Sequence, residues 1–255
     1  MKPLLELENV TYAYHGTEGE TPALTDISFS VEKGEFIAIV GESGCGKSTL
    51  LSLICGLLSP EDGLLKINGK NPKESPDSVG YMLQHDHLFE WRSVYQNVIL
   101  GLEIRHDLTP ETKKKARELL NVYGLEQFSD AKPSALSGGM RQRAALIRTL
   151  LLEPELLLLD EPFSALDYQT RLKVSDEIGQ ILRTQHKTAV LVTHDLGEAI
   201  SMADRILVCS KRPATIQKII PVQFSDAALT PLARRNAPEF KHYFHLIWKE
   251  LNQDD

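Results

Sequence analysis

Gly41-Glu42-Ser43-Gly44-Cys45-Gly46-Lys47-Ser48-Thr49 fits the pattern G-x-x-x-x-G-K-[ST], a backbone cradle for nucleotide phosphates. An apolar run with strand character, 35–40, precedes it, and 50–55 behind it is typical of a buried helix. A strand, a glycine loop and a helix N-terminus form an anion site, because successive N–H groups converge and the helix dipole favours negative charge. Lys47 is expected to reach the β- and γ-phosphates, and the Ser48 hydroxyl to ligate Mg²⁺.

The competing interpretation of this loop is a chance match in a glycine-bearing turn, which the strand before it and the helix after it disfavour. By itself the loop indicates only that a nucleoside triphosphate binds, since kinases, GTPases and motor ATPases all use it.

The composition is that of an ordinary soluble globular protein. A chain of 255 residues suffices for one large α/β domain or two small ones, and its 42% apolar and 25% charged residues are typical values. The net charge of −7 argues against a general nucleic-acid binder, so no nucleic-acid partner is expected. No apolar run approaches the ~18 residues that span a bilayer, and residues 1–6 do not resemble a secretory signal. The chain is therefore expected to stay in the cytosol.

Three cysteines, Cys45, Cys55 and Cys209, are an odd number without metal-ligand spacing, which is consistent with reduced thiols. Cys45 has two interpretations. A helix N-terminus lowers a thiol's pKa, which would make Cys45 reactive. The alternative, which we favour, is a small residue that merely fits the loop.

The order of elements predicts an α/β fold. Residues 5–10 and 23–31 alternate like strands around a polar turn, and a second β section runs from 63–69 to 79–83. From about 94 to 152 the chain has mostly helical patterns.

Two fully apolar strands, 156–159 and 189–192, follow the helical section, with a helical run, 171–183, between them. Strands buried on both faces belong in a parallel sheet covered by helices. The sequence therefore predicts a nucleotide-binding core interrupted by a helical insert.

The end of the chain is expected to contain an amphipathic helix, 238–251. Its apolar side chains are Phe240, Tyr243, Phe244, Ile247, Trp248 and Leu251. Docking on the chain's own core is favoured over binding a partner.

Two adjacent acids, Asp160 and Glu161, end the apolar strand 156–159. An unpaired buried charge is costly, so such a pair suggests a function. Asp160 suits the Mg²⁺ shell, and Glu161 suits polarisation of the attacking water. Acids that are simply exposed at a strand end are the alternative.

Ser137-Gly138-Gly139, which opens a helix, is a second anion site without a lysine or a companion loop. Such a half-site makes sense if it completes a phosphate pocket on another molecule. The alternative is an ordinary N-cap, with Ser137 capping the helix that begins near Gly139.

These motifs, taken together, resemble those of ATP-binding-cassette (ABC) ATPases. The run 136–143, Leu-Ser-Gly-Gly-Met-Arg-Gln-Arg, is similar to the family's signature motif and lies about twenty residues ahead of Leu-Leu-Leu-Leu-Asp-Glu-Pro. The remaining motifs follow in the family's order, up to about residue 216: Tyr14 resembles the adenine-stacking aromatic, Gln84 the Q-loop glutamine, 164–167 the D-loop and His194 the switch histidine. The implied fold is a P-loop NTPase (RecA-like) core with an antiparallel β subdomain and an inserted α-helical subdomain.

The resemblance implies one ABC ATPase domain over 1–255. Its parts are a nucleotide-binding core with the β subdomain at about 1–90 and 153–215, a helical insert at about 91–152, and a tail at about 216–255.

The resemblance also implies a head-to-tail homodimer with two ATP molecules between the subunits. Ser137, Gly138 and Gly139 would complete the γ-phosphate site of the other subunit, and Asp167 would reach across the dimer. Gln84 would contact the Mg²⁺ or water shell, and His194 would hold the γ-phosphate beside Glu161.

An isolated histidine is more often structural than catalytic, but His194 directly follows an apolar strand, where α/β folds place ligand groups. By contrast, His85-Asp86-His87 is interpreted as loop surface beside Gln84 rather than as a metal site.

The segment 88–98 resembles the groove that receives a membrane subunit, so permease subunits are expected to bind near 84–97. Trp91, Asn97 and the Met140 variant of the signature resemble importers of nitrate, sulfonates, taurine and vitamin precursors, which work with an extracytoplasmic solute-binding protein. The chain is thus expected at the cytoplasmic face of the membrane. Glu90, where proline is common, and Thr149 depart from the family pattern. An exporter or cell-division ATPase, or a soluble non-transport ABC protein, is the alternative.

Overall fold

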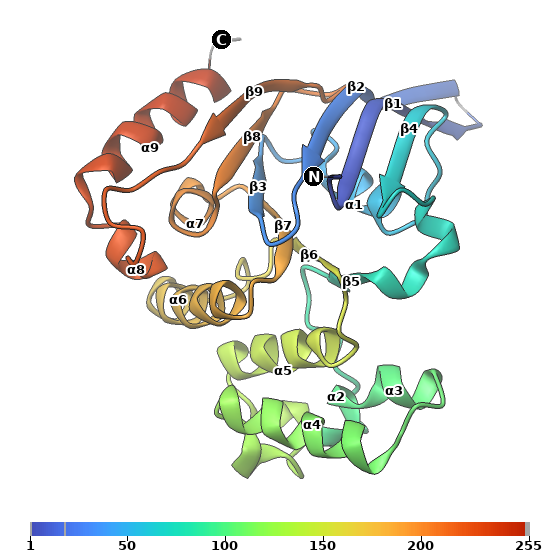
Figure 1. The fold of residues 1–255 in the computed structure, drawn as a ribbon, viewed down its shortest axis with the longest axis vertical. Helices are drawn as coiled ribbons and strands as arrows, with labels where there is room; N and C mark the ends of the chain where they lie inside the picture. The colour runs from blue at the N-terminus through green and yellow to red at the C-terminus, as the bar shows by residue number, and fades with distance from the viewer. Residues whose placement is uncertain (1, 18, 253–255) are drawn as a thin grey trace.

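The computed structural model describes residues 2–17 and 19–252. Its centre is a six-stranded sheet in the order β5-β6-β7-β3-β8-β9, in which β5 to β8 run parallel and β9 pairs antiparallel with β8 (Figure 1). The strands are β3 (Phe36–Val40), β5 (Val79–Met82), β6 (Leu156–Asp160), β7 (Thr188–Thr193), β8 (Arg205–Cys209) and β9 (Ile216–Pro221).

A smaller antiparallel sheet, β2-β1-β4, packs with α1 (Lys47–Ile54) on one face of the large sheet. Its strands are β1 (Leu5–Gly16), β2 (Gly19–Val31) and β4 (Asp62–Ile67). In the central strand β1, Leu5 lies opposite Val31 of β2 and Ile67 of β4. β1 and β2 are longer than the alternating pattern predicted, because their pairing continues to Gly16 and Gly19 across the turn that was expected to separate them.

The large sheet is buried on both faces because alternate side chains of each strand point to opposite sides. In β3, Ile37 and Ile39 pack with helix α1 (Lys47–Ile54) and the antiparallel sheet. Phe36, Ala38 and Val40 pack in the second cluster, with the helices on the other face. This double burial explains the uninterrupted apolar strands in the sequence.

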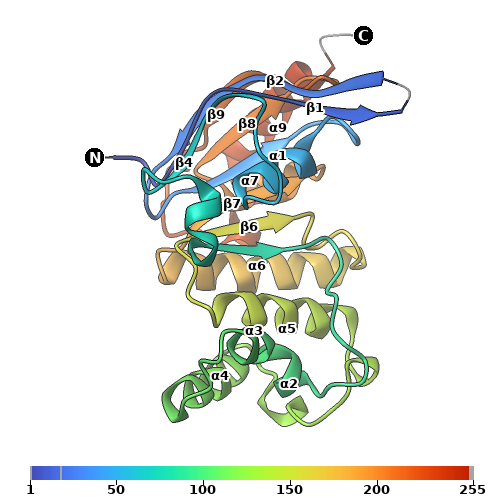
Figure 2. The same ribbon diagram turned by 90° about the vertical axis from the view of Figure 1, so that its right-hand side faces the viewer.

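The helices of the insert lie on one side of the sheet (Figure 2). They are α2 (Val94–Val98), α3 (Leu100–Ile104), α4 (Pro110–Val122) and α5 (Gly138–Leu150). The core helices are α6 (Tyr168–Thr184), α7 (Leu196–Met202), α8 (Pro231–Arg234) and α9 (Pro238–Leu251). Short 3-10 turns are η1 (Pro72–Glu74), η2 (Pro76–Ser78), η3 (Glu126–Phe128) and η4 (Pro133–Ala135). α5 packs against α6 and so joins the insert to the core.

The predicted α/β class is confirmed, but some boundaries differ. α6 starts at Tyr168 rather than Arg171, since the Asp167 carboxylate accepts a hydrogen bond from the Thr170 N–H and caps the helix. β9, the first element of the tail expected at about 216–255, pairs with β8 in the core sheet. That strand was missed because only Ile220 of its six residues is fully buried, which leaves a weak apolar signal.

α9 docks on the core only in part. Ile247 is fully buried, and Phe240, Tyr243 and Leu251 pack against the large cluster. Phe244 and Trp248, predicted on the same side, remain 39% and 56% exposed. Within the described residues, no helix is long and apolar enough to cross a membrane.

Gly63 and Gly69 provide a test of the β1–β4 junction. Both have positive φ, 88° and 75°. A Cβ on Gly63 would lie 2.4 Å from the Asn9 carbonyl oxygen, whereas one on Gly69 meets nothing within 4 Å. Gly69→Ala should therefore lower the free energy of unfolding by about 1–2 kcal/mol, from backbone strain alone, and Gly63→Ala by about 2–5 kcal/mol. Urea denaturation measures both, and equal losses would contradict the close approach.

Candidate functional site

The candidate site lies at the carboxyl ends of four neighbouring strands. β3 leads into the loop 41–49, β5 leads to Gln84, β6 ends in Asp160-Glu161, and β7 leads to His194. Parallel strands bring these ends to one edge of the sheet, where α/β folds bind ligands. A pocket there is lined by Ser43, Gly44, Gly46, Lys47, Ser48, Thr49, Gln84, Asp160 and Glu161.

The loop depends on a glycine at position 46. Gly46 has φ 128°, and a Cβ on it would lie 2.8 Å from the Ala23 carbonyl oxygen. The following Lys47 is only 6% exposed. Its Nζ donates to the carbonyl oxygens of Gly41 and Glu42 at 2.8 and 2.7 Å. The buried ammonium is thus satisfied at the mouth of the loop, with Ser48 and Thr49 opening α1 beside it.

Tyr14 of β1 extends over the same helix start. Its hydroxyl is 2.9 Å from the Thr49 Oγ1, and its ring meets Tyr12 edge to face at 5.1 Å. Because Tyr14 remains 42% exposed, it has a face available for stacking. Its role with adenine stays a prediction.

Asp160 presents its carboxylate to the loop. The Ser48 Oγ donates to Oδ1 at 3.4 Å, and the Tyr81 hydroxyl donates to Oδ2 at 3.1 Å. Burial raises the pKa of Asp160, which the bonds from Ser48 and Tyr81 partly oppose.

A hydroxyl and a carboxylate suit Mg²⁺, which prefers oxygen ligands and takes the rest from phosphates and water. Among the described residues, no group of three or more His, Cys, Asp or Glu side chains could hold a metal. The Ser48 hydroxyl and the Asp160 carboxylate would supply two oxygen ligands of such a site.

Glu161, which follows β6, contacts side chains that follow the two neighbouring strands, β5 and β7. Its Oε2 accepts a hydrogen bond from the Gln84 Nε2 at 3.2 Å, and its Oε1 is 3.1 Å from the His194 Nδ1. Its φ is 43°, a left-handed value for a non-glycine residue, which costs about 1–3 kcal/mol. Such strain is concentrated at functional sites, and here it aims the carboxylate between the β5 and β7 loops.

The structure does not bring Ser137, Gly138, Gly139 or Asp167 to this pocket. The Ser137 Oγ accepts a hydrogen bond from the Met140 N–H at 3.4 Å, so the N-cap interpretation is correct for this residue. Ser137 and Gly138 are exposed, while Gly139 is buried against α6. Asp167 is exposed, and its bond from Thr170 lowers the pKa of its carboxyl.

Two interpretations of nearby residues need correction. Cys45 is 2% exposed and packs in an apolar cluster, so a reactive thiol was wrong and the small residue that fits the loop is right. His85 and His87 are exposed as expected, but Asp86 is not merely loop surface. It forms an ion pair with Arg141 of α5.

Sequence reasoning also missed Arg171, which connects two loops. Its guanidinium donates to the Leu166 carbonyl at 3.1 Å, ahead of Asp167, and pairs with Asp195 at 3.3 Å, beside His194. Its position four residues after Asp167, on the first turn of α6, was the available signal.

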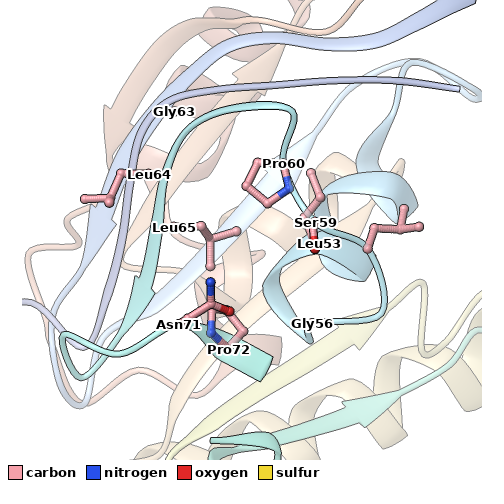
Figure 3. A pocket seen from close by; sticks show the side chains of 10 residues that line it. Leu53, Gly56, Ser59, Pro60, Gly63, Leu64, Leu65, Asn71 and Pro72 are labelled. Carbon is pink, nitrogen blue, oxygen red and sulfur yellow. The ribbon is translucent and has the colours of Figure 1, made fainter. Parts of the chain in front are cut away.

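A second hollow lies away from these groups, between α1 and β4 (Figure 3). None of the residues that line it is titratable: they are Leu53, Gly56, Leu58, Ser59, Pro60, Gly63, Leu64, Leu65, Asn71 and Pro72. Its one hydroxyl, that of Ser59, has no titratable acid or base beside it in this lining, so the hollow is a weaker candidate for chemistry than the first pocket.

Known proteins share these features. The ABC transporter family matches residues 24–164. An uncharacterized ABC transporter ATP-binding protein of Bacillus subtilis is 50% identical over 97% of this chain and 95% of its own length. The nitrate import ATP-binding protein of a Synechocystis species is 39% identical over 94% of this chain and 91% of its own. A dimeric ATP-binding cassette in a post-hydrolysis state, bound to ADP and Pi, has 30% identity and a TM-score of 0.75, covering 86% of this chain and 99% of that one.

Glu198 of α7 makes the site's surroundings sensitive to pH. It is 2% exposed, and its Oε2 accepts a hydrogen bond from the Thr193 hydroxyl at 2.8 Å. Burial, with the charge of Asp195, raises the pKa of Glu198 to about 7, against the pull of Arg171 and Arg235. The folded chain then keeps a proton that the unfolded chain loses, so the unfolding free energy falls as pH rises from about 4.5 to about 7.

Glu198→Gln should therefore remove part of this pH dependence and raise the melting temperature at pH 8 relative to the parent, with little gain at pH 4.5. Thermal melts across this range measure it, with the exposed Glu118→Gln as control. Identical pH slopes in parent and Glu198→Gln would contradict the shifted group.

Proposed function

Because the chain belongs to the ABC transporter ATP-binding family, we propose that it is the ATP-hydrolysing subunit of an ABC import system at the cytoplasmic face of the membrane. The observation that carries the proposal is the Glu161 carboxylate, held by Gln84 and His194 at the edge of the loop pocket.

Hydrolysis of the γ-phosphate needs a base for water and donors for the phosphate. Glu161 is the base, and its two neighbours fix one carboxylate oxygen each. The buried Lys47 ammonium donates hydrogen bonds to two loop carbonyl oxygens. When a nucleotide binds, it would donate to phosphate oxygens instead. Ser48, Asp160 and Gln84 would hold Mg²⁺, which supplies charge neutralisation on the phosphates.

The exposed start of α5 supports a homodimer with shared sites. Ser137 and Gly138 face solvent at a helix N-terminus, where backbone N–H groups and the dipole attract a phosphate. We place this end against the phosphate loop of the second subunit, with Asp167 crossing the same interface. The dimeric cassette bound to ADP and Pi, which is 30% identical, supports the arrangement.

The segment after Gln84 has the features of a docking surface for permease subunits. Phe89 and Trp91 stack at 4.6 Å, and Trp91 is 72% exposed. Asn97 is fully buried. Its Oδ1 accepts a hydrogen bond from the Phe89 N–H, and its Nδ2 donates to the Phe89 carbonyl oxygen. These two hydrogen bonds thus fix the backbone of Phe89, beside which the exposed Trp91 ring stacks. The nitrate import relative supports a small solute such as nitrate. The resemblance of Trp91, Asn97 and Met140 extends the proposed solutes to sulfonates, taurine and vitamin precursors, and it includes an extracytoplasmic binding protein as an indirect partner.

Glu161→Gln tests the base. It should keep ATP binding and lower turnover by about 10²- to 10⁴-fold, giving an ATP-stabilised dimer. Phosphate release and gel filtration with ATP measure the two effects. Glu155→Gln, at the other end of β6, is the matched control and should hydrolyse ATP at the parent rate. Turnover at the parent rate in Glu161→Gln would exclude it as the base.

Ser137→Arg tests the shared site. A bulky cation at the exposed helix start should block dimer closure while leaving ATP affinity of the monomer within about twofold, because the residue lies outside the monomer's pocket. Nucleotide titration and sedimentation measure these separately, with the exposed Ser134→Arg as control. If Ser137→Arg lost monomer affinity to the same extent, the signature would belong to its own subunit's site.

A further inference from the structure

A third hollow, of about 360 Å³, lies where the helical insert meets the core. Its walls come from three helices: the end of α4, the middle of α5 and the second half of α6 (Figure 2). It shares no lining residue with the loop pocket, so the two are separate. Sites for small molecules in proteins have volumes of roughly 300–1,000 Å³. The hollow therefore has room for a small organic molecule.

The Tyr123 hydroxyl, in the wall of this hollow, has no hydrogen-bond partner among the described residues. The side chain is 4% exposed, and it packs in the large apolar cluster. Burial raises the pKa of Tyr123, so the phenol stays protonated and is a hydrogen-bond donor. A buried polar group without a partner costs about 1–3 kcal/mol, which a phenylalanine at this position would avoid. An acceptor on a bound molecule would remove this cost.

Two opposite charges lie side by side in the same wall. The Arg143 Nη2 is 2.7 Å from the Glu177 Oε2, and the two side chains are 23% and 51% exposed. The Arg143 Nε is buried and bonds to no other described residue. A guanidinium has five N–H donors, so Arg143 can hold a second carboxylate while it keeps its contact with Glu177. The exposed part of the Glu177 carboxylate can accept a hydrogen bond from a cation in the same way.

Aliphatic side chains provide the rest of the lining that the argument needs. Ile178 of α6 is buried, Ile181 packs partly buried against the large cluster, and Val122 at the end of α4 is 61% exposed. A hydrocarbon group that covers such a surface removes it from water, which contributes about 25 cal/mol per Å². The hollow thus combines an aliphatic surface, a neutral donor and two adjacent opposite charges.

We propose that this hollow binds a small zwitterion with a branched aliphatic body, of the class of the aliphatic α-amino acids. Its carboxylate accepts hydrogen bonds from Arg143 and Tyr123, and its ammonium donates to Glu177. Its side chain covers Val122 and Ile178. Glu177 repels a molecule that is only an anion, and Arg143 repels one that is only a cation, so a ligand with both charges adjacent fits the pair best.

This site is independent of the proposed ATP hydrolysis. Its lining comes from α4, α5 and α6 and includes neither the loop 41–49 nor Glu161. A ligand there contacts the insert and the core at once, because α4 and α5 belong to the insert and α6 to the core. Nucleotide and zwitterion are therefore expected to bind at the same time.

Three matched probes test the proposal on the full chain by isothermal titration calorimetry. L-Leucine carries both charges, 4-methylpentanoate lacks the ammonium, and 3-methylbutylamine lacks the carboxylate. Leucine should bind saturably with a Kd below about 1 mM, and each of the other two at least about 10-fold more weakly. Saturating ADP should leave leucine binding unchanged, because the two pockets share no residue.

Three variants assign the contacts. Arg143→Met and Glu177→Gln should each weaken leucine binding by about 10-fold or more, and Glu177→Gln should also tighten 4-methylpentanoate, because a repelling charge is removed. Tyr123→Phe should weaken leucine binding by about 3- to 10-fold. It should also leave the melting temperature of the unliganded chain at or above the parent's, since the hydroxyl has no partner to lose.

Arg117→Met is the matched control. It also removes an arginine that pairs with a glutamate, but Arg117 lies on α4 outside the hollow and pairs with Glu126 at 3.8 Å. It should bind leucine as the parent does. Circular dichroism checks that each variant is folded, and Glu177→Gln replaces a half-exposed side chain, so it keeps the fold even where Arg143→Met does not.

The inference is overturned if leucine shows no saturable binding up to about 20 mM, or if the three probes bind equally. Displacement of leucine by ADP, or an equal loss of binding in Arg117→Met, would overturn it by placing the ligand elsewhere. A lower melting temperature of unliganded Tyr123→Phe would also count against it, because the hydroxyl would then have a partner in the free chain. None of these results bears on Glu161 as the base, which turnover of Glu161→Gln tests separately.

Discussion

The structure depends on how two adjacent acids are accommodated at the end of a buried strand. β6 is apolar from Leu156 to Leu159 and buried throughout, and it ends in Asp160 and Glu161. Burying a carboxylate without partners is costly, so each acid must be met by groups from neighbouring elements. Ser48 and Tyr81 meet Asp160, and Gln84 and His194 meet Glu161. The parallel order β5-β6-β7-β3 places all these partners at one edge, so sheet topology and site chemistry are one constraint.

The sequence was most informative where a pattern is local and repeats. Alternation, apolar strands and the glycine loop predicted the α/β core, because those signals arise from side-chain periodicity within a few residues. Part of the candidate pocket could be assembled for the same reason, because Lys47, Asp160 and Glu161 lie in or directly after recognisable patterns. Gln84 and His194 were identified by the resemblance to ABC ATPases. Boundaries failed where the signal is weak, as in β9, whose edge position leaves most of its residues partly exposed.

The pairings across the fold could not be predicted in this way. Asp86 and Arg141 are separated by 55 residues, and nothing in either local pattern identifies the other. Arg171 and Asp195 are likewise joined only by the packing of α6 beside the β7 loop. Such contacts depend on the relative placement of whole elements. A sequence pattern gives the residue types available for pairing and leaves the pairing itself to the tertiary structure.

The two interpretations of Ser137, as a helix cap and as half of a phosphate site, are compatible. The first four N–H groups of a helix have no partner within it, and the Ser137 Oγ satisfies one of them, that of Met140. The cap fixes where α5 begins, and it leaves the amide of the exposed Gly138 and the positive end of the helix dipole without a partner in the cap. A helix start that was fully satisfied within its own chain would have little to offer a phosphate. One that was uncapped would fray and present its donors in no fixed geometry. A single serine bond therefore holds the end of α5 in order, as its proposed role toward a nucleotide on a second subunit would require.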